Sequence, residues 1–171
     1  MGKGVCTFIE YEDLSPKLKE IKLQCANDYG IEVDFWEMIS GKSPGGIATP
    51  KDKTIDLDKD GFKHLSVEQV FDHEILHFCQ DFAPFRRLTT EIKSMDAKIG
   101  QHFKKLWNRK LISAFMPIIS KQAFDYEMTI NAMLPYNHPE GLDRRLARKF
   151  KKARRQCLDM LKSRHTTSRK V

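Results

Sequence analysis

The sequence predicts an α+β fold, in which a small antiparallel sheet or hairpin packs on a helix and the C-terminal half is mostly helical. Three observations support this prediction. Residues 1–60 combine a helical pattern with short strand patterns, a capped amphipathic helix begins at Ser66, and beyond Thr89 the apolar residues recur mostly at helical spacing.

The N-terminal third contains one helix and several short strands. Ser15 and Pro16 form a helix start with proline at the first helical position, and an apolar stripe continues until Gly30 ends the helix. Alternating apolar and polar residues and a Gly/Pro-rich turn indicate the strands. The expected strands are residues 5–11, residues 31–35 and the hairpin strands 47–49 and 54–58.

The remainder is expected to be helical. Thr89 or Thr90 is a possible cap for a helix that runs to about Trp107. The segments expected after it are an apolar segment at residues 111–119 interrupted by Pro117, a helix from Ser120 that ends before Pro135, and a last helix that opens at Pro139 and Glu140.

Length and composition place this chain among ordinary globular proteins. It has 171 residues, of which 40% are hydrophobic and 31% charged. We expect residues 1–140 to form the main domain and residues 141–171 a basic C-terminal helix of the same domain. No apolar run has membrane-spanning length, and the N-terminus lacks the apolar core of a signal peptide. We therefore expect a protein that is not secreted and does not enter a membrane. The four widely spaced cysteines are expected to be free thiols.

The positive charge is concentrated at the C-terminus. The net charge is +7, and residues 143–171 hold 12 of the 30 Lys and Arg residues but only two of the 23 Asp and Glu residues. Such a helix is suited to bind the phosphates of a nucleic acid, although a solvated helix that aids solubility would look the same. The candidate nucleic-acid-binding residues are Arg144, Arg145, Arg148, Lys149, Lys151, Lys152, Arg154 and Arg155.

The helix predicted to begin at Ser66 carries the candidate metal-binding and catalytic residues. Ser66 and Gln69 form a capping box, and His73-Glu74-Ile75-Leu76-His77 is an H-E-x-x-H motif inside that helix. Both imidazoles project from one side because they are one turn apart, so they supply two corners of a tetrahedral zinc site. Glu74 is then placed to act as general base on a metal-bound water.

A catalytic zinc site needs a third protein ligand, and Glu127 is the first candidate. Glu127 shares a helix face with Ala123, Ile130 and Leu134, where an unpaired carboxylate would be costly and a metal, or an ionic partner, would compensate its charge. The alternative third ligands are Glu140 and Asp143, at the start of the last helix, and His102. Zinc follows from the ligand types, although other divalent ions bind the same groups.

Several segments resemble small gluzincin-type zinc metallopeptidases. These are the H-E-x-x-H motif, the expected hairpin ahead of it, and Glu127-Met128-Thr129-Ile130-Asn131, which is similar to the Glu-x-x-Ala-Asn pattern of the ImmA/IrrE group, with Ile130 in place of the alanine. His77 followed by Gln80 is similar to H-E-x-x-H-x-x-Q peptidases of phage-like genomes. SprT-like proteases are less similar because His102 is followed by Phe103 rather than glycine. The resemblance implies a zincin-like domain whose glutamate ligand is Glu127.

These observations predict a zinc-dependent metallopeptidase that hydrolyses peptide bonds of a protein or peptide substrate. One zinc ion per chain would carry the water that Glu74 activates, Tyr136 or His138 would stabilise the oxyanion, and residues 47–49 would pair with an extended substrate. The alternative is a nucleic-acid-binding or assembly protein that acts through its basic helix and retains an inactive zincin-like core. A cytoplasmic protein is expected, or a virion-associated one if a phage encodes it.

Overall fold

The computed structural model describes residues 5–40, 43–62, 65–95 and 121–168, and the side chain of Lys121 is outside this description. The chain divides into two compact units. The first consists of residues 1–78 with residues 161–171, and the second of residues 79–160. The α+β class predicted from the sequence is confirmed.

The first unit contains a four-stranded sheet with the strand order β1-β2-β4-β3. Its strands are β1 (Val5–Phe8), β2 (Glu32–Ser40), β3 (Gly46–Thr49) and β4 (Thr54–Asp58). The predicted hairpin is present, since β3 and β4 pair antiparallel. The sheet is mixed rather than purely antiparallel as predicted, because β1 and β2 also pair antiparallel but β2 and β4 run parallel. Strand β4 lies between β2 and β3. It runs antiparallel to β3 and therefore in the same direction as β2.

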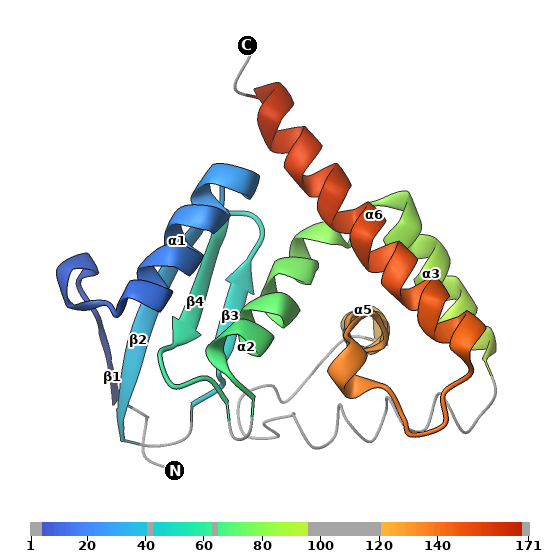
Figure 1. The fold of residues 1–171 in the computed structure, drawn as a ribbon, viewed down its shortest axis with the longest axis horizontal. Helices are drawn as coiled ribbons and strands as arrows, with labels where there is room; N and C mark the ends of the chain where they lie inside the picture. Colours follow the sequence, from blue (N-terminus) through green and yellow to red (C-terminus); the bar gives the residue numbers. More distant parts are fainter. Residues whose placement is uncertain (1–4, 41–42, 63–64, 96–120, 169–171) are drawn as a thin grey trace. The chain divides into compact units, whose positions relative to one another are not determined.

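One face of this sheet supplies the core of the first unit. Val33 and Phe35 on β2 and Ile55 and Leu57 on β4 are at most 1% exposed, and alternation along each strand places them on a common face. Helix α1 (Pro16–Tyr29) packs beside β2, as Figure 1 shows.

Helix α1 begins and ends where the sequence predicts. The Ser15 side chain accepts a hydrogen bond from the amide of Leu18 at 3.4 Å, and Gly30 ends the helix at a φ of 63°. A Cβ at Gly30 would lie 2.3 Å from Nδ1 of His165, so the end of α1 also packs closely against the last turns of the chain. Lys162 strengthens this contact with a 2.8 Å ion pair to Asp28.

Helix α2 (Val67–Glu74) packs against β3 and β4. The predicted capping box is confirmed, because Ser66 accepts from the Gln69 amide at 3.4 Å and the Gln69 side chain accepts from the Ser66 amide at 2.9 Å. A 3₁₀ helix, η2 (Ile75–Cys79), follows α2 directly.

The second unit is helical in its described part. It contains α3 (Ala83–Ser94), α5 (Lys121–Met133), the 3₁₀ turn η3 (Pro135–Asn137) and most of α6 (Arg144–Ser168). Phe85 on α3, Ile130 on α5 and Phe150 on α6 are fully buried. Helices α3 and α5 lie against each other, and the rings of Phe85 and Tyr126 meet edge to face with their centroids 5.7 Å apart.

The start of α3 differs from the sequence prediction. The helix begins at Ala83 with Pro84 in its first turn, rather than at Thr89 or Thr90. Both threonine hydroxyls instead bond to carbonyls one turn earlier, at 3.0 and 3.1 Å, which satisfies them inside the helix. The apolar segment predicted at residues 111–119 lies outside the described residues. Among the described helices, none combines the length and apolar character needed to span a membrane.

Candidate metal centre

The H-E-x-x-H motif lies at the junction of α2 and η2, rather than in one continuous α-helix as predicted. Glu74 is the last residue of α2, and the 3₁₀ segment begins at Ile75. With three residues per turn, Leu76 and Cys79 align on one side, and both are fully buried. The tightened turn therefore buries these apolar side chains while leaving His73 and His77 together, with ring centroids 5.3 Å apart.

Glu74 is buried next to the histidine pair. It is 8% exposed, and its Oε2 lies 3.8 Å from Nε2 of His77. Its carboxylate is therefore largely removed from bulk water, on the side of α2 that faces β3. A buried carboxylate is stabilised only by a hydrogen bond, a protonated partner or a cation.

Gly46, the first residue of β3, lets the strand approach Glu74 closely. A Cβ at this position would lie 2.8 Å from Cγ of Glu74, 2.8 Å from Cγ1 of Val70 and 3.0 Å from Cδ2 of Leu57. These distances are shorter than ordinary carbon contacts of about 3.5–4.0 Å. The sequence prediction did not identify this role for Gly46, because the run of glycines and proline at residues 41–46 indicates only a turn.

Glu127 lies on α5, which two polar contacts fix against α3. The hydroxyl of Thr129 is 2.9 Å from the hydroxyl of Thr89, and Lys93 forms a 2.7 Å ion pair with Asp125. Because these contacts lie on both sides of Glu127 in the sequence, they fix the rotation of α5 about its axis. Glu127, whose side chain is half-buried, lies between these two contacts on α5.

A buried asparagine pair supports the same helix and was not predicted. The Asn131 amide donates to the carbonyl of Glu127 at 2.8 Å, and the Asn137 amide donates to Oδ1 of Asn131 at 2.9 Å. Asn131 is fully buried and Asn137 is 5% exposed. The pair ties the last turn of α5 to η3. An asparagine four residues after the candidate ligand is the one signal in the sequence that could have indicated it.

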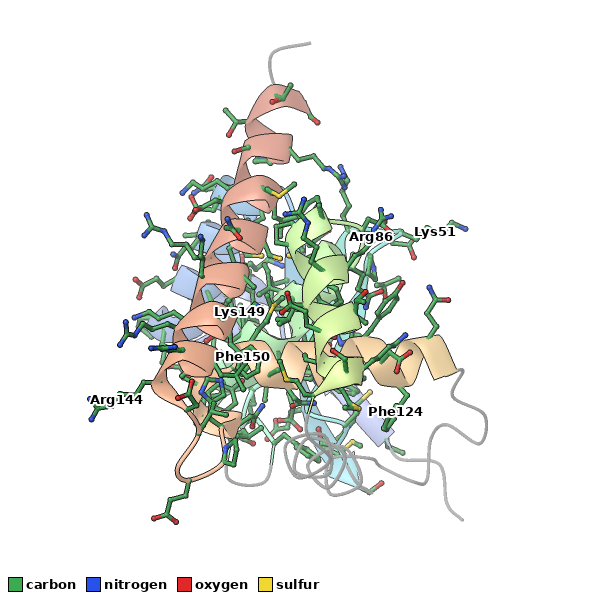
Figure 2. All side chains as sticks on the ribbon, turned by 90° about the vertical axis from the view of Figure 1, so that its right-hand side faces the viewer. Lys51, Arg86, Phe124, Arg144, Lys149 and Phe150 are labelled. Carbon is green, nitrogen blue, oxygen red and sulfur yellow. The ribbon has the colours of Figure 1, made fainter. Side chains whose placement is uncertain are left out.

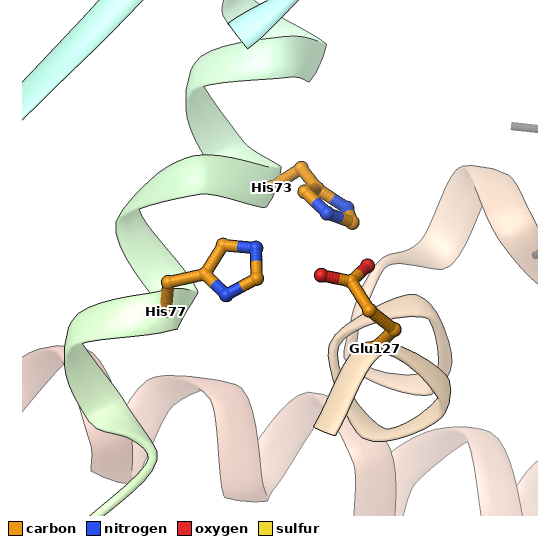
Figure 3. A group of neighbouring side chains, drawn as sticks. All are labelled: His73, His77 and Glu127. Carbon is orange, nitrogen blue, oxygen red and sulfur yellow. The ribbon is translucent and has the colours of Figure 1, made fainter. Parts of the chain in front are cut away.

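His73, His77 and Glu127 form a group that could hold a metal ion (Figure 3). Each offers one ligand atom, these atoms lie within 4.8 Å of one another, and all three residues are half-buried. Ligand atoms about 2.1 Å from a tetrahedral ion are about 3.4 Å apart, so small side-chain rotations suffice to complete the site. Among the residues that the structure describes, this is the one such group of three or more.

The other candidate ligands and donors occupy different environments. Asp143 is exposed and caps α6, accepting from the amides of Arg145 and Leu146 at 2.9 and 3.1 Å, and Glu140 is exposed in the preceding turn. His102 lies outside the described residues. The two candidate oxyanion donors, Tyr136 and His138, are half-buried in and after η3.

The side chain of His138 contacts both α5 and α6. Its Nε2 lies 2.8 Å from the carbonyl oxygen of Ala132, and its ring is 5.6 Å from that of Phe150. This arrangement ties the turn after α5 to the beginning of α6.

The cysteines form no disulfide, as predicted. Cys79, two residues after His77, is fully buried and hydrogen bonds to Cys157, which lowers the pKa of Cys157 against the opposing effect of burial. Cys79 therefore belongs to the packing of the second unit rather than to the group of metal ligands.

Comparison with known proteins does not identify a relative. A scan against protein-family models and searches of curated proteins and of solved structures found no match to this chain.

Proposed function

We propose that this protein is a zinc-dependent metallopeptidase in which His73, His77 and Glu127 hold the metal and Glu74 is the general base. The observation that carries the proposal is the approach of the three ligand atoms to within 4.8 Å, with a buried glutamate directly after the first histidine. Two imidazoles and one carboxylate are a ligand set of catalytic zinc sites, in which the fourth position stays open.

The charges of the site fit a divalent cation. Neutral histidines contribute no charge, and the carboxylates of Glu74 and Glu127 together contribute two negative charges. A zinc ion would balance both. The donor types are also those that zinc accepts, although the same set binds other divalent ions.

Zinc supplies a Lewis acid that lowers the pKa of a bound water and polarises a carbonyl group. Glu74 would accept a proton from the attacking water and later pass it to the leaving nitrogen of the substrate. Because Glu74 is buried against Gly46, its side chain has little freedom to leave that position. Within the described part of the chain, strand β3 is at an edge of the sheet, so its outer side could add a substrate strand beside Glu74.

Metal analysis tests the ligand set. Elemental mass spectrometry of the purified protein should find close to one zinc per chain, and His73→Ala and Glu127→Ala should each lose it. Glu140→Ala, Asp143→Ala and His102→Ala are matched controls, because each removes an alternative third ligand and should retain the metal. No zinc in the wild type after refolding with metal, or zinc retained by Glu127→Ala and lost in one control, would contradict the proposed ligands.

Peptide cleavage tests the role of Glu74. The wild-type protein should cleave members of a random fluorogenic peptide library, and Glu74→Gln should retain zinc because Glu74 is not a proposed ligand. Its kcat/KM should fall about 10²–10⁴-fold, the usual contribution of general acid–base catalysis. Cleavage within tenfold of the wild type would exclude Glu74 as the base.

A further inference from the structure

Helix α6 carries a continuous row of cations on one side. We call Arg144, Arg145, Arg148, Lys151, Lys152 and Arg155 the cationic stripe, and all six are exposed. At about 100° per residue they fall within an arc of about 120°. Figure 2 shows Arg144 extending away from α6, whereas Phe150 lies on another side of the helix. The buried residues Phe150, Ala153 and Cys157 lie opposite the stripe, so packing fixes the direction in which the stripe faces.

The stripe is poorly neutralised. Arg155 lies 3.7 Å from Asp159, but the two side chains are 85% and 69% exposed, and such pairs are weak. The other five cations form no ion pair with any residue in the described part of the chain. By contrast, Lys149 lies beside the stripe and forms a 2.6 Å ion pair with Glu91 on α3.

The spacing of the stripe disfavours a role in helix stability. Arg144 and Arg148, Arg148 and Lys152, and Lys151 and Arg155 are like-charge pairs four residues apart. Such pairs destabilise a helix, whereas a helix selected only for solubility and stability would alternate glutamate with lysine at this spacing. An anionic ligand would remove this repulsion.

The surroundings of the stripe favour a nucleic acid over a membrane surface. An amphipathic helix that lies in a bilayer exposes an apolar face to the lipid. In α6 the apolar side chains Phe150, Cys157 and Leu161 are at most 6% exposed, so this face is already used in packing. The stripe also contains four arginines and two lysines, and arginine is suited to bidentate phosphate contacts.

The form of the stripe favours duplex DNA. It has no aromatic side chain on which bases could stack, as in proteins that bind single strands. From Arg144 to Arg155 the helix rises about 16 Å, close to five base-pair steps. The major groove of B-DNA admits an α-helix, whereas the deep and narrow major groove of duplex RNA does not. We propose that the cationic stripe binds the phosphate backbone of double-stranded DNA without sequence preference.

Salt dependence of binding tests this proposal. Fluorescence anisotropy with two unrelated 20-base-pair DNA duplexes should give equal affinities. If about five phosphates are neutralised, the slope of log K against log salt should be about −4.5, a loss of about 500-fold between 50 and 200 mM NaCl. A slope weaker than about −1, or a strong preference for one duplex, would overturn the proposal.

Matched variants locate the surface. The double variant Arg148→Ala, Lys152→Ala removes two central cations and should make the slope shallower by about 1.8, since alanine preserves the helix. The control Lys51→Ala, Arg87→Ala removes two exposed cations outside α6 with the same change in net charge, and it should bind within twofold of the wild type. Equal effects of the two double variants, with circular dichroism confirming that both are folded, would overturn the assignment to the stripe.

Other polyanions test the choice of partner. A duplex RNA of the same length, a single-stranded DNA and vesicles containing phosphatidylserine should each bind more weakly than duplex DNA. Tighter binding of any of these would replace DNA as the partner and overturn the proposal. Glu74→Gln should bind DNA as the wild type does, so the result does not depend on the proposed peptidase activity.

Discussion

Gly46 offers a test of the geometry around Glu74 that needs no substrate. In Gly46→Ala the new methyl group would lie 2.8 Å from Cγ of Glu74, 2.8 Å from Cγ1 of Val70 and 3.0 Å from Cδ2 of Leu57. Val70 is 4% exposed and Leu57 is fully buried, so neither side chain can easily move away. The φ of Gly46 is not in the left-handed region, so the backbone itself tolerates alanine.

Two opposing effects set the size of the change. Alanine restricts the unfolded chain and would by itself stabilise the fold by about 0.4–1 kcal/mol. Overpacking a dense core costs about 1–3 kcal/mol. Because the methyl group meets three side chains at once, we expect overpacking to prevail and the free energy of unfolding to fall by about 1–2 kcal/mol.

Urea unfolding in the presence of a chelator measures this change without a contribution from bound metal. The midpoint should fall while the m-value stays constant. A double-mutant cycle with Val70→Ala provides the control, because removing Val70 Cγ1 should make the second substitution cost about 1 kcal/mol less than it costs alone. A Gly46→Ala protein as stable as the wild type, or additive effects in the cycle, would refute the close approach of β3 to α2.

Three further predictions concern the packing around the site. Thr129→Val should lower the free energy of unfolding by about 1 kcal/mol, because it removes the buried 2.9 Å hydrogen bond to Thr89. In the same urea assay, the control Thr90→Val should have a smaller effect, because Thr90 is exposed. Glu68 has its pKa lowered to about 2, chiefly by its hydrogen bond with Lys17 and also by Ser66, so it stabilises the fold above pH 4.5 and loses this effect as the pH falls toward 2. Glu68→Gln should therefore cost at most about 1 kcal/mol at pH 7 and nothing near pH 2, and a cost that is independent of pH would contradict this. Cys25 is fully buried, and its pKa is raised to about 12, chiefly by burial and also by the charge of Asp28. Iodoacetamide at pH 8 should therefore label the exposed Cys6 in the folded protein but Cys25 only after unfolding. Peptide mass spectrometry measures the labelling of each cysteine.

The parts of the fold that depend on local chemistry could be predicted from the sequence. Helix α1 begins after Ser15 and ends at Gly30, and α2 begins at the capping box of Ser66 and Gln69. Each of these signals acts within one helical turn. The parallel pairing of β2 with β4 could not be predicted, since it depends on where β4 inserts after the hairpin. The start of α3 was misjudged because a threonine hydroxyl can either cap a helix or bond back to it.

The candidate site divides in the same way. The spacing of His73 and His77 brings their rings together even though the α-helix tightens to a 3₁₀ turn between them. Gly46 and the pair of Asn131 and Asn137 could not be identified, because their roles appear only when separate segments meet. In a sequence, a glycine that permits close approach looks like a glycine in a turn.

Glu127 could be named as a candidate ligand from the sequence because its carboxylate falls on an otherwise apolar helix face and because residues 127–131 resemble the Glu-x-x-Ala-Asn pattern. A carboxylate within the apolar face of α5 costs stability unless a cation or a hydrogen-bond donor compensates it. The same reasoning applies to Glu74, which is 8% exposed. The imidazoles of His73 and His77 and the carboxylate of Glu127 offer ligand atoms within 4.8 Å of one another, a set that is suited to a divalent ion. The six cations of α6 present the opposite case, in which like charges repel on an exposed surface and an anionic partner would relieve them. On α6 the repulsion between like charges is the physical reason to expect an anionic ligand, whereas at the candidate metal centre the types and the closeness of the ligand atoms are the reason to expect a cation.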